Sequence, residues 1–117
     1  MKPAVLAIND INETHKPIVG AKALCLAHLF VAGFKVPEMI CITTNCYESF
    51  VDKTGLRERI MLELSRKNFS DMRWEEIWDA ALRIRNMFLT MPFPDYITSQ
   101  LAGPLEMLFS GSPAAIR

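Results

Sequence analysis

Residues 18–50 read I-V-G-A-K-A-L-C-L-A-H-L-F-V-A-G-F-K-V-P-E-M-I-C-I-T-T-N-C-Y-E-S-F and carry three structural signals in order. A nearly all-apolar stretch at 21–32 lies between Gly20 and Gly33, which predicts a helix that one glycine opens and the other ends. Its apolar character on every side predicts burial on most sides. Residues 39–42 have the length of a buried strand, and Thr43 or Thr44 can then cap the next helix.

Lys22 is the unusual residue of this stretch. A cation in the first turn of a helix faces the positive end of the helix dipole, which costs up to about 1 kcal/mol. The backbone N–H groups of the same turn can bind an anion, and a lysine beside them would strengthen that binding. Two interpretations stay open from the residues alone: Lys22 is the solvated rim of a buried helix, or it belongs to an anion site.

The motifs of this stretch also carry a family resemblance. The chain has V-G-A-K-A at 19–23, A-G-F-K-V-P at 32–37 and T-T-N-C-Y at 43–47, followed by Phe50. This series resembles the N-terminal part of the ATP-binding domain of phosphoenolpyruvate synthase and pyruvate phosphate dikinase. That family typically shows V-G-G-K-G/N-A, then A-G-x-x-V-P-P-G-F, then T-T-x-A-Y. Within the first motif, alanines at 21 and 23 replace residues that are often Gly or Asn.

The resemblance implies a fold and a role for the whole chain. It implies a mainly helical α+β fold with a small sheet, the N-terminal lobe of an ATP-grasp domain, with residues 1–117 forming the first part of a longer chain. By position, Gly20, Lys22 and Arg117 would bind ATP; the final A-A-I-R at 114–117 is similar to the family's V-A-V-R-S-S-A strand. The full enzyme would transfer phosphate from ATP to a carrier histidine, then to pyruvate or a related acceptor. Its Mg²⁺ would be held by carboxylates of a second lobe.

The sequence contains no recognisable catalytic or metal-binding motif. No P-loop, G-x-G-x-x-G or Ser-His-Asp arrangement occurs, so we assign no catalytic residue and no metal ligand. His15 and His28 do not fit the family's carrier motif, and His28 is interpreted as a core histidine. Residues 1–117 are therefore expected to be inactive alone. The alternative is a stand-alone, non-catalytic α/β interaction module derived from this lobe. The phosphoryl acceptor, the oligomeric state and the natural C-terminus stay open.

Composition narrows the class of protein. The 117 residues are half hydrophobic and have a formal net charge of zero, which predicts one folded domain without general affinity for nucleic acid or membranes. The three cysteines form no C-x-x-C pair and lie in apolar surroundings, so they are predicted to be core thiols in a reducing cytosol. The apolar helix is too short to span a bilayer. Together these features predict a cytoplasmic protein.

The remaining segments predict further elements. Strands are expected at 4–8 and 114–117, and the first would run parallel to 39–42 if the connection between them is a β-α-β crossover. Helices are expected at 45–53, at 56–67 with Ile60, Leu64 and Met61 inward, and at 74–89. Another is expected from Pro94, with a kink or a restart near residue 103. The stripe on 74–89 comprises Trp74, Ile77, Trp78, Ala81, Leu82, Phe88 and Leu89. Its helical spacing predicts that both tryptophans lie in the core.

Overall fold

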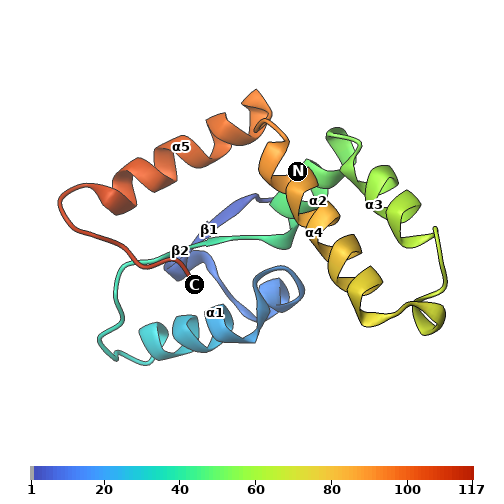
Figure 1. Cartoon of the computed structure of the whole chain (residues 1–117). Coiled ribbons are helices and arrows are strands. Elements are labelled where there is room, and N and C mark those ends of the chain that lie inside the picture. Colours follow the sequence, from blue (N-terminus) through green and yellow to red (C-terminus); the bar gives the residue numbers. More distant parts are fainter. Residues whose placement is uncertain (1) are drawn as a thin grey trace. The chain divides into compact units, whose positions relative to one another are not determined.

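The computed structural model describes residues 2–117 (Figure 1). These residues form two compact units. Unit 1 comprises the residues up to Glu48 together with Asp95–Arg117, and unit 2 is Ser49–Pro94. The elements are β1 (Val5–Ala7), α1 (Lys16–Val31), β2 (Ile40–Ile42), α2 (Thr44–Lys53), α3 (Leu56–Leu64), α4 (Trp74–Thr90) and α5 (Asp95–Phe109), with 3-10 turns at Ile8–Asp10, Glu13–His15 and Phe69–Asp71. The predicted mainly helical α+β fold with a small sheet is confirmed.

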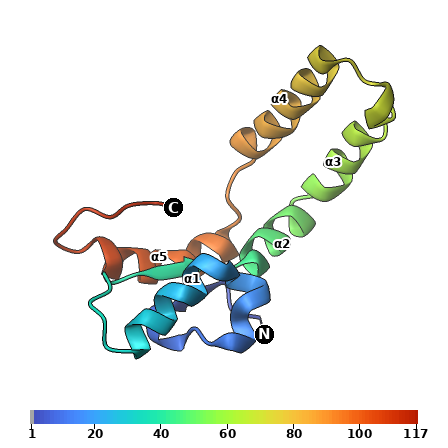
Figure 2. The ribbon, with the colours of Figure 1, turned by 90° about the horizontal axis from the view of Figure 1, so that it is seen from below.

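Unit 1 places its two strands between two helices. In Figures 1 and 2, α1 lies on one side of β1 and β2, and α5 lies on the other. The strands pair over three residues, with Leu6 opposite Cys41. Thr43, just after β2, extends the pairing: its backbone N–H donates to the Ala4 carbonyl (2.9 Å), and its buried hydroxyl donates to the Pro3 carbonyl (2.6 Å). The N-terminal segment is thus fixed through the first threonine of the T-T motif.

The strand pairing is antiparallel, so the predicted parallel crossover is wrong. That prediction assumed that a helix alone carries the chain from one strand to the next. Two 3-10 turns instead separate β1 from α1, and residues 34–39 return to β2 without helix or strand. These additional segments allow the chain to enter β2 from the opposite end.

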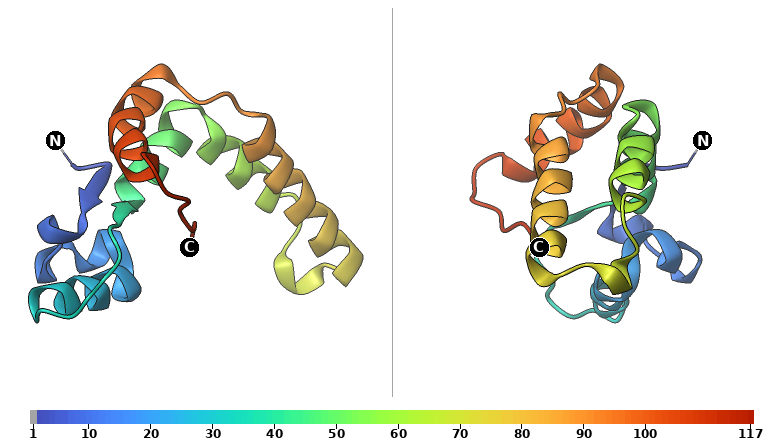
Figure 3. Two further views of the ribbon diagram at one scale, coloured as in Figure 1. Left: turned by 90° about the vertical axis from the view of Figure 1, so that its left-hand side faces the viewer. Right: turned by 45° about the vertical axis from the view of Figure 1, so that its right-hand side comes forward.

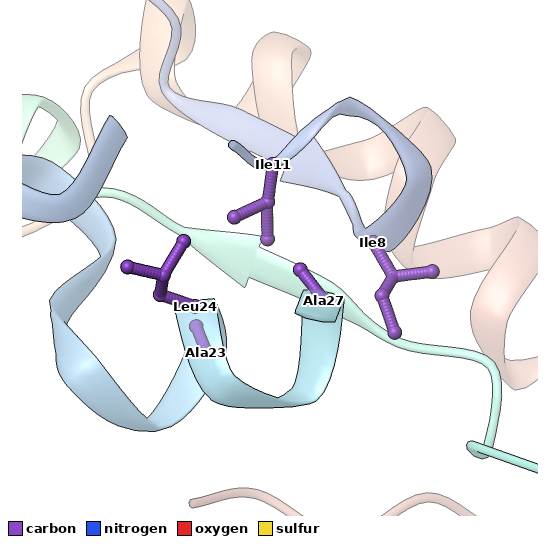
Figure 4. Close-up of a cluster of buried hydrophobic side chains, with 5 residues drawn as sticks. All are labelled: Ile8, Ile11, Ala23, Leu24 and Ala27. Atoms are coloured by element: carbon purple, nitrogen blue, oxygen red, sulfur yellow. The ribbon is translucent and has the colours of Figure 1, made fainter. Parts of the chain in front are cut away.

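The core of unit 1 is a small apolar cluster between α1 and the segment that follows β1. Figure 4 shows Leu24 and Ala27 of α1 pointing toward Ile11 and Ile8, with Ala23 beside them. Partly buried Leu6, Val19, Val36, Met39 and Cys41 pack around this cluster. Because only one side of α1 meets the cluster, Leu29, Phe30 and Val31 stay exposed. The expectation that α1 is buried on most sides is therefore wrong for this part of the chain.

Gly33 ends α1 as predicted. Its φ of 90° is left-handed, and its N–H donates to the Phe30 carbonyl (3.1 Å) while the Phe34 N–H donates to the Leu29 carbonyl (3.1 Å). This pair of bonds is the Schellman arrangement, which satisfies carbonyls that the last helical turn leaves free. After this turn, residues 34–39 lead the chain back to β2.

The C-terminal part of unit 1 bears on two predictions. A kink or a restart was expected near residue 103; α5 runs from Asp95 to Phe109 with Pro104 inside it, so the helix does not restart there. Residues 114–117 form no strand, although one was expected there. A strand needs a hydrogen-bonding partner, and the described sheet consists of β1 and β2 only.

Unit 2 is built on a helical hairpin. In Figures 2 and 3, α3 and α4 lie side by side and run in opposite directions, joined by the Phe69–Asp71 turn. Leu56 and Val51 are its most buried apolar residues. At the other end of α4, the ring of Phe50 stacks on Phe88 (centroids 6.1 Å apart) and tilts against Phe93 (5.6 Å). Apolar packing thus holds the end of the unit where the chain enters and leaves it.

A buried carboxylate near the end of α3 connects the two helices of the hairpin. The Glu63 side chain of α3 is only 4% exposed, and its Oε1 accepts from Nε of Arg83 on α4 at 2.5 Å. Arg66 Nε lies 3.4 Å from the other oxygen. The predicted inward residues Met61 and Leu64 are exposed instead. Sequence reasoning missed this pair because a glutamate within a helix is usually solvated.

The tryptophans of α4 are exposed, which contradicts the predicted core position. Trp74 is 66% exposed and Trp78 is 64% exposed, and their rings contact each other at a centroid distance of 5.6 Å. The face of α4 that is buried or half-buried carries Ile77, Ala80, Ile84 and Phe88 instead. Helical spacing fits both stripes, and the small side chain of Ala80 permits close approach of α3. The inner stripe therefore packs, and the aromatic stripe faces outward.

The cysteines occupy three different environments. Cys25 is exposed on α1, so the prediction that all three are core thiols is wrong for this residue. Cys46 is buried, and Cys41 is half-buried in β2. Burial raises the pKa of both the Cys41 and the Cys46 thiol, which lowers their thiolate fraction at neutral pH. Cys25 is thus the thiol most accessible to solvent.

Candidate functional site

Gly20 divides α1 into two helical segments. Its backbone angles, φ 82° and ψ 172°, are not helical, and residues with a side chain rarely adopt them. Nothing lies within 4 Å of where a Cβ would sit, so conformation rather than space requires glycine here. Residues 21–31 therefore have an amino-terminal turn of their own, as the sequence predicted.

Lys22 lies in that turn and is exposed, as is Gly20. Within residues 2–117, no hydrogen bond or ion pair uses the Lys22 ammonium group. The ammonium therefore has no acidic neighbour to neutralise it, although it stands where the helix dipole disfavours a cation. A free cation beside an amino-terminal turn has the chemistry to bind an anion.

A compact turn before Gly20 holds the approach to this site. The Asn12 side chain accepts from the Thr14 N–H (3.0 Å) and the Thr14 hydroxyl (2.6 Å). In return, the Asn12 N–H donates to Nδ1 of His15 (3.2 Å). This reciprocal pattern is a capping box in which histidine takes the usual place of Glu or Gln. The only sequence signal for this box is the three-residue spacing of Asn12 and His15, and histidine is not a usual residue at that position.

Glu13 and His28 connect this turn to the last turn of α1. The Glu13 carboxylate lies 2.9 Å from Nε2 of His28. His28 is 53% exposed at its side chain, so the interpretation as a core histidine is wrong. Neither histidine has metal-binding neighbours, since no group of three His, Cys, Asp or Glu residues in the described chain could hold a metal. Both histidines brace the segment that leads to Gly20 and Lys22.

Arg117 is exposed in the irregular segment after α5. No hydrogen bond or ion pair among the described residues connects it to Gly20 or Lys22. Because the strand expected at 114–117 is not formed, no regular element fixes the direction of this side chain. Of the three residues predicted to bind ATP, Gly20 and Lys22 lie together in one turn. Arg117 lies in an irregular segment and, within residues 2–117, is not bonded to either of them.

A shallow cavity lies elsewhere in unit 1. It has a volume of about 310 Å³ and is lined by Lys2, Pro3, Ala4, Val5, Gln100 and Pro104. None of the residues predicted to bind ATP lines it. Its walls come from the segment before and within β1 and from α5, and they are mostly apolar. The cavity therefore does not add to the site around Lys22.

Comparison with known proteins identifies the class of domain. The sequence matches the family described as "Pyruvate phosphate dikinase, AMP/ATP-binding domain" over residues 16–117. That range includes Gly20, Lys22 and Arg117. The chain belongs to this family, and the resemblance seen in the sequence motifs is confirmed.

Individual relatives show how much of a longer protein this region represents. The chain is 33% identical over 93 residues to phosphoenolpyruvate synthase of Aeropyrum pernix, which covers 80% of the chain and 11% of that protein. It is 25% identical over 118 residues to rifampicin phosphotransferase of Bacillus subtilis, covering 100% of the chain and 13% of that protein. The rifampicin phosphotransferase of Bacillus cereus is 27% identical over the same length. The chain thus spans 11–13% of the length of these relatives.

Two further findings bear on the class of protein. The match supports an ATP-binding domain of a phosphotransferase. No helix within the described part of the chain has both the length and the apolar character that a membrane span requires.

Proposed function

We propose that this chain is the N-terminal, ATP-binding lobe of a phosphoenolpyruvate synthase-like phosphotransferase, and that Gly20 and Lys22 form its phosphate contact. The observation that carries the proposal is the unpaired, exposed Lys22 in the turn opened by Gly20. Backbone N–H groups and a point-charge lysine together suit a polyphosphate. Family membership over residues 16–117 supports ATP as the ligand.

The remaining parts of the reaction belong to the longer protein. Mg²⁺ would be held by carboxylates of a second ATP-grasp lobe, since the described residues offer no metal-binding group. Arg117 would contact the phosphates once residues 114–117 pair as a strand in the complete N-terminal lobe. Relatives named for phosphoenolpyruvate synthesis and for rifampicin phosphorylation match the same region. We therefore place the choice of acceptor, pyruvate or a related molecule, outside this lobe.

The lobe alone is expected to bind ATP weakly and to hydrolyse none. A hydrogen bond to a charged group contributes about 1.5–3 kcal/mol. Fixing a free ligand costs roughly 4–15 kcal/mol before any affinity appears. Lys22 and the amides after Gly20 make few such bonds, so the expected dissociation constant is millimolar or weaker.

The test is a titration of the ¹⁵N-labelled chain with Mg-ATP, followed by amide chemical shifts. Shifts are expected at residues 20–23 and should be lost in Lys22→Ala. Lys35→Ala is the matched control, because Lys35 is an exposed lysine just beyond the other end of α1. It should keep the shifts. Arg117→Ala tests whether the last residue adds to binding.

Three outcomes would contradict the proposal or its expected weak binding. Saturating shifts that persist in Lys22→Ala would remove Lys22 from the site. No shift near Gly20 at any attainable Mg-ATP concentration would favour the alternative, a non-catalytic interaction module. A micromolar dissociation constant or ATP turnover would show that the site is complete without a second lobe.

A further inference from the structure

The outer face of α4 carries an apolar stripe that nothing in the described chain covers. Trp74, Trp78, Leu82 and Leu89 follow one another at helical spacing, and all four are exposed. The inner face of the same helix is already used, because Ile77, Ala80 and Ile84 pack toward α3. The stripe is therefore a second apolar surface of α4, separate from the face that packs in the core of the hairpin. A contiguous surface of this kind indicates an interaction site.

Charges along the stripe are separated by sign. Glu75 and Asp79 flank its amino-terminal half, beside the two tryptophans. Arg85 lies within its carboxyl-terminal half, on the same face as Trp78. All three are exposed, and within residues 2–117 none of the three side chains makes an ion pair. A surface that is acidic at one end and basic at the other is complementary to itself when it is reversed.

We propose that α4 of a second copy of this chain occupies the stripe, lying antiparallel to the first. In the register that fits the spacing, Trp74 lies opposite Leu89 of the second copy, and Leu82 lies near the twofold axis. Trp78 then lies opposite Arg85 of the second copy, where the guanidinium can cover the indole ring. Asp79 lies within reach of the same guanidinium. Every favourable contact occurs twice, as a twofold interface requires.

The reverse orientation explains the charges better than a parallel one. Parallel helices would bring Asp79 beside Asp79 and Arg85 beside Arg85, and like charges in contact disfavour association. The antiparallel contact instead pairs the acidic half with the basic half. It also covers all four apolar residues of the stripe at once. This inference does not depend on ATP binding.

Sedimentation velocity over a concentration series from micromolar to millimolar, at low salt, tests the proposal. We expect a reversible equilibrium between monomer and dimer. Trp78→Ala should raise the dissociation constant at least about tenfold, because truncated tryptophans are frequent interface hot spots. Phe69→Ala is the control, since Phe69 is an equally exposed aromatic residue (73%) of unit 2 outside α4. It should leave the equilibrium unchanged, and circular dichroism confirms that each variant is folded.

Charge exchange tests the orientation. Arg85→Glu and Asp79→Lys should each weaken the dimer, and the double variant Asp79→Lys/Arg85→Glu should restore it. Failure of the double variant to restore association would exclude the antiparallel register. A chain that is monomeric at millimolar concentration would overturn the proposal, and the stripe would then belong to a different partner.

Discussion

Units 1 and 2 are held together by different interactions. Unit 1 closes over an apolar cluster in which Leu24 and Ala27 meet Ile8 and Ile11. Unit 2 buries a carboxylate, Glu63, between the helices of its hairpin, and two arginines neutralise it. Apolar packing is non-directional and depends on filled volume, whereas a buried ion pair depends on both partners being present. Substitutions should therefore fail in different ways in the two units.

The largest loss is expected at Leu24 in unit 1. Leu24→Ala should lower the free energy of unfolding by about 2–5 kcal/mol, because it removes transfer free energy and leaves a cavity. Amide hydrogen exchange then locates the effect, since protection should fall in α1 and β2. Val31→Ala, at a 78% exposed position of the same helix, is the control. It should change stability by less than about 0.5 kcal/mol. Equal losses in both variants would mean that the outer face of α1 is also covered.

A smaller loss is expected at Arg83 in unit 2. Arg83→Met leaves Glu63 with only the longer contact to Arg66, and should cost about 2 kcal/mol, within the range for hydrogen bonds to charged groups. The double variant Glu63→Met/Arg83→Met should be less destabilised than Arg83→Met, because it also removes the buried charge. Arg59→Met, at an exposed position of α3, serves as control. A double variant that loses more than Arg83→Met would mean that Glu63 stabilises the hairpin even without Arg83, through its contact with Arg66.

Predictability from the sequence also differs between the units. In unit 1, Gly20 and Gly33 each carry a backbone requirement, and the apolar run before Thr43 has the length of a strand, so the helix and the second strand could be placed correctly. Strand direction could not, because it depends on the path of the turns between β1 and α1. In unit 2 only helical periodicity was available. Periodicity finds α4 but cannot say which of its two apolar stripes packs against α3.

The same limit applies to the candidate site. Gly20 and Lys22 could be found because they are adjacent in sequence and the local backbone alone brings them together. The role of Glu13 could not be predicted, since its partner His28 lies fifteen residues further along the chain, in the last turn of α1. Arg117 was placed by resemblance alone, and its position depends on pairing that the described chain does not form. The sequence thus predicts motifs formed by neighbouring residues, but it does not predict contacts between residues that are distant in sequence.

A modest effect on folding is expected at Trp78, in contrast to the core position that periodicity predicted. Trp78→Ala should lower the free energy of unfolding by about 1 kcal/mol, since the ring is exposed and its main aromatic contact is Trp74. Chemical denaturation at low protein concentration measures this without contribution from association. A loss near 3 kcal/mol or more, as in emptied aromatic core sites, would show that the stripe is covered within the folded monomer.

The smallest effect is expected at the start of α4 and depends on pH. The Glu76 carboxylate accepts the Arg73 N–H at 3.0 Å and lies 3.0 Å from the Lys67 ammonium. The hydrogen bond from the Arg73 backbone, followed by that from Lys67, lowers the pKa of Glu76 below its ordinary value of 4.5. Because the folded pKa is lower than the unfolded one, the stabilisation is fully present above that ordinary value. It is lost as the pH falls through the lower, folded value.

Thermal melts of the wild type and Glu76→Gln across this pH range test the effect. The wild type should melt slightly higher at neutral pH, and the difference should shrink as the solution is acidified below pH 4.5. Glu75→Gln is the matched control, because Glu75 lies in the same first turn, where the helix dipole also favours a carboxylate, but has no backbone or lysine partner. Its difference from the wild type should vary less with pH. Identical pH profiles for the two variants would show that the dipole, and not the bonds to Arg73 and Lys67, stabilises the start of α4.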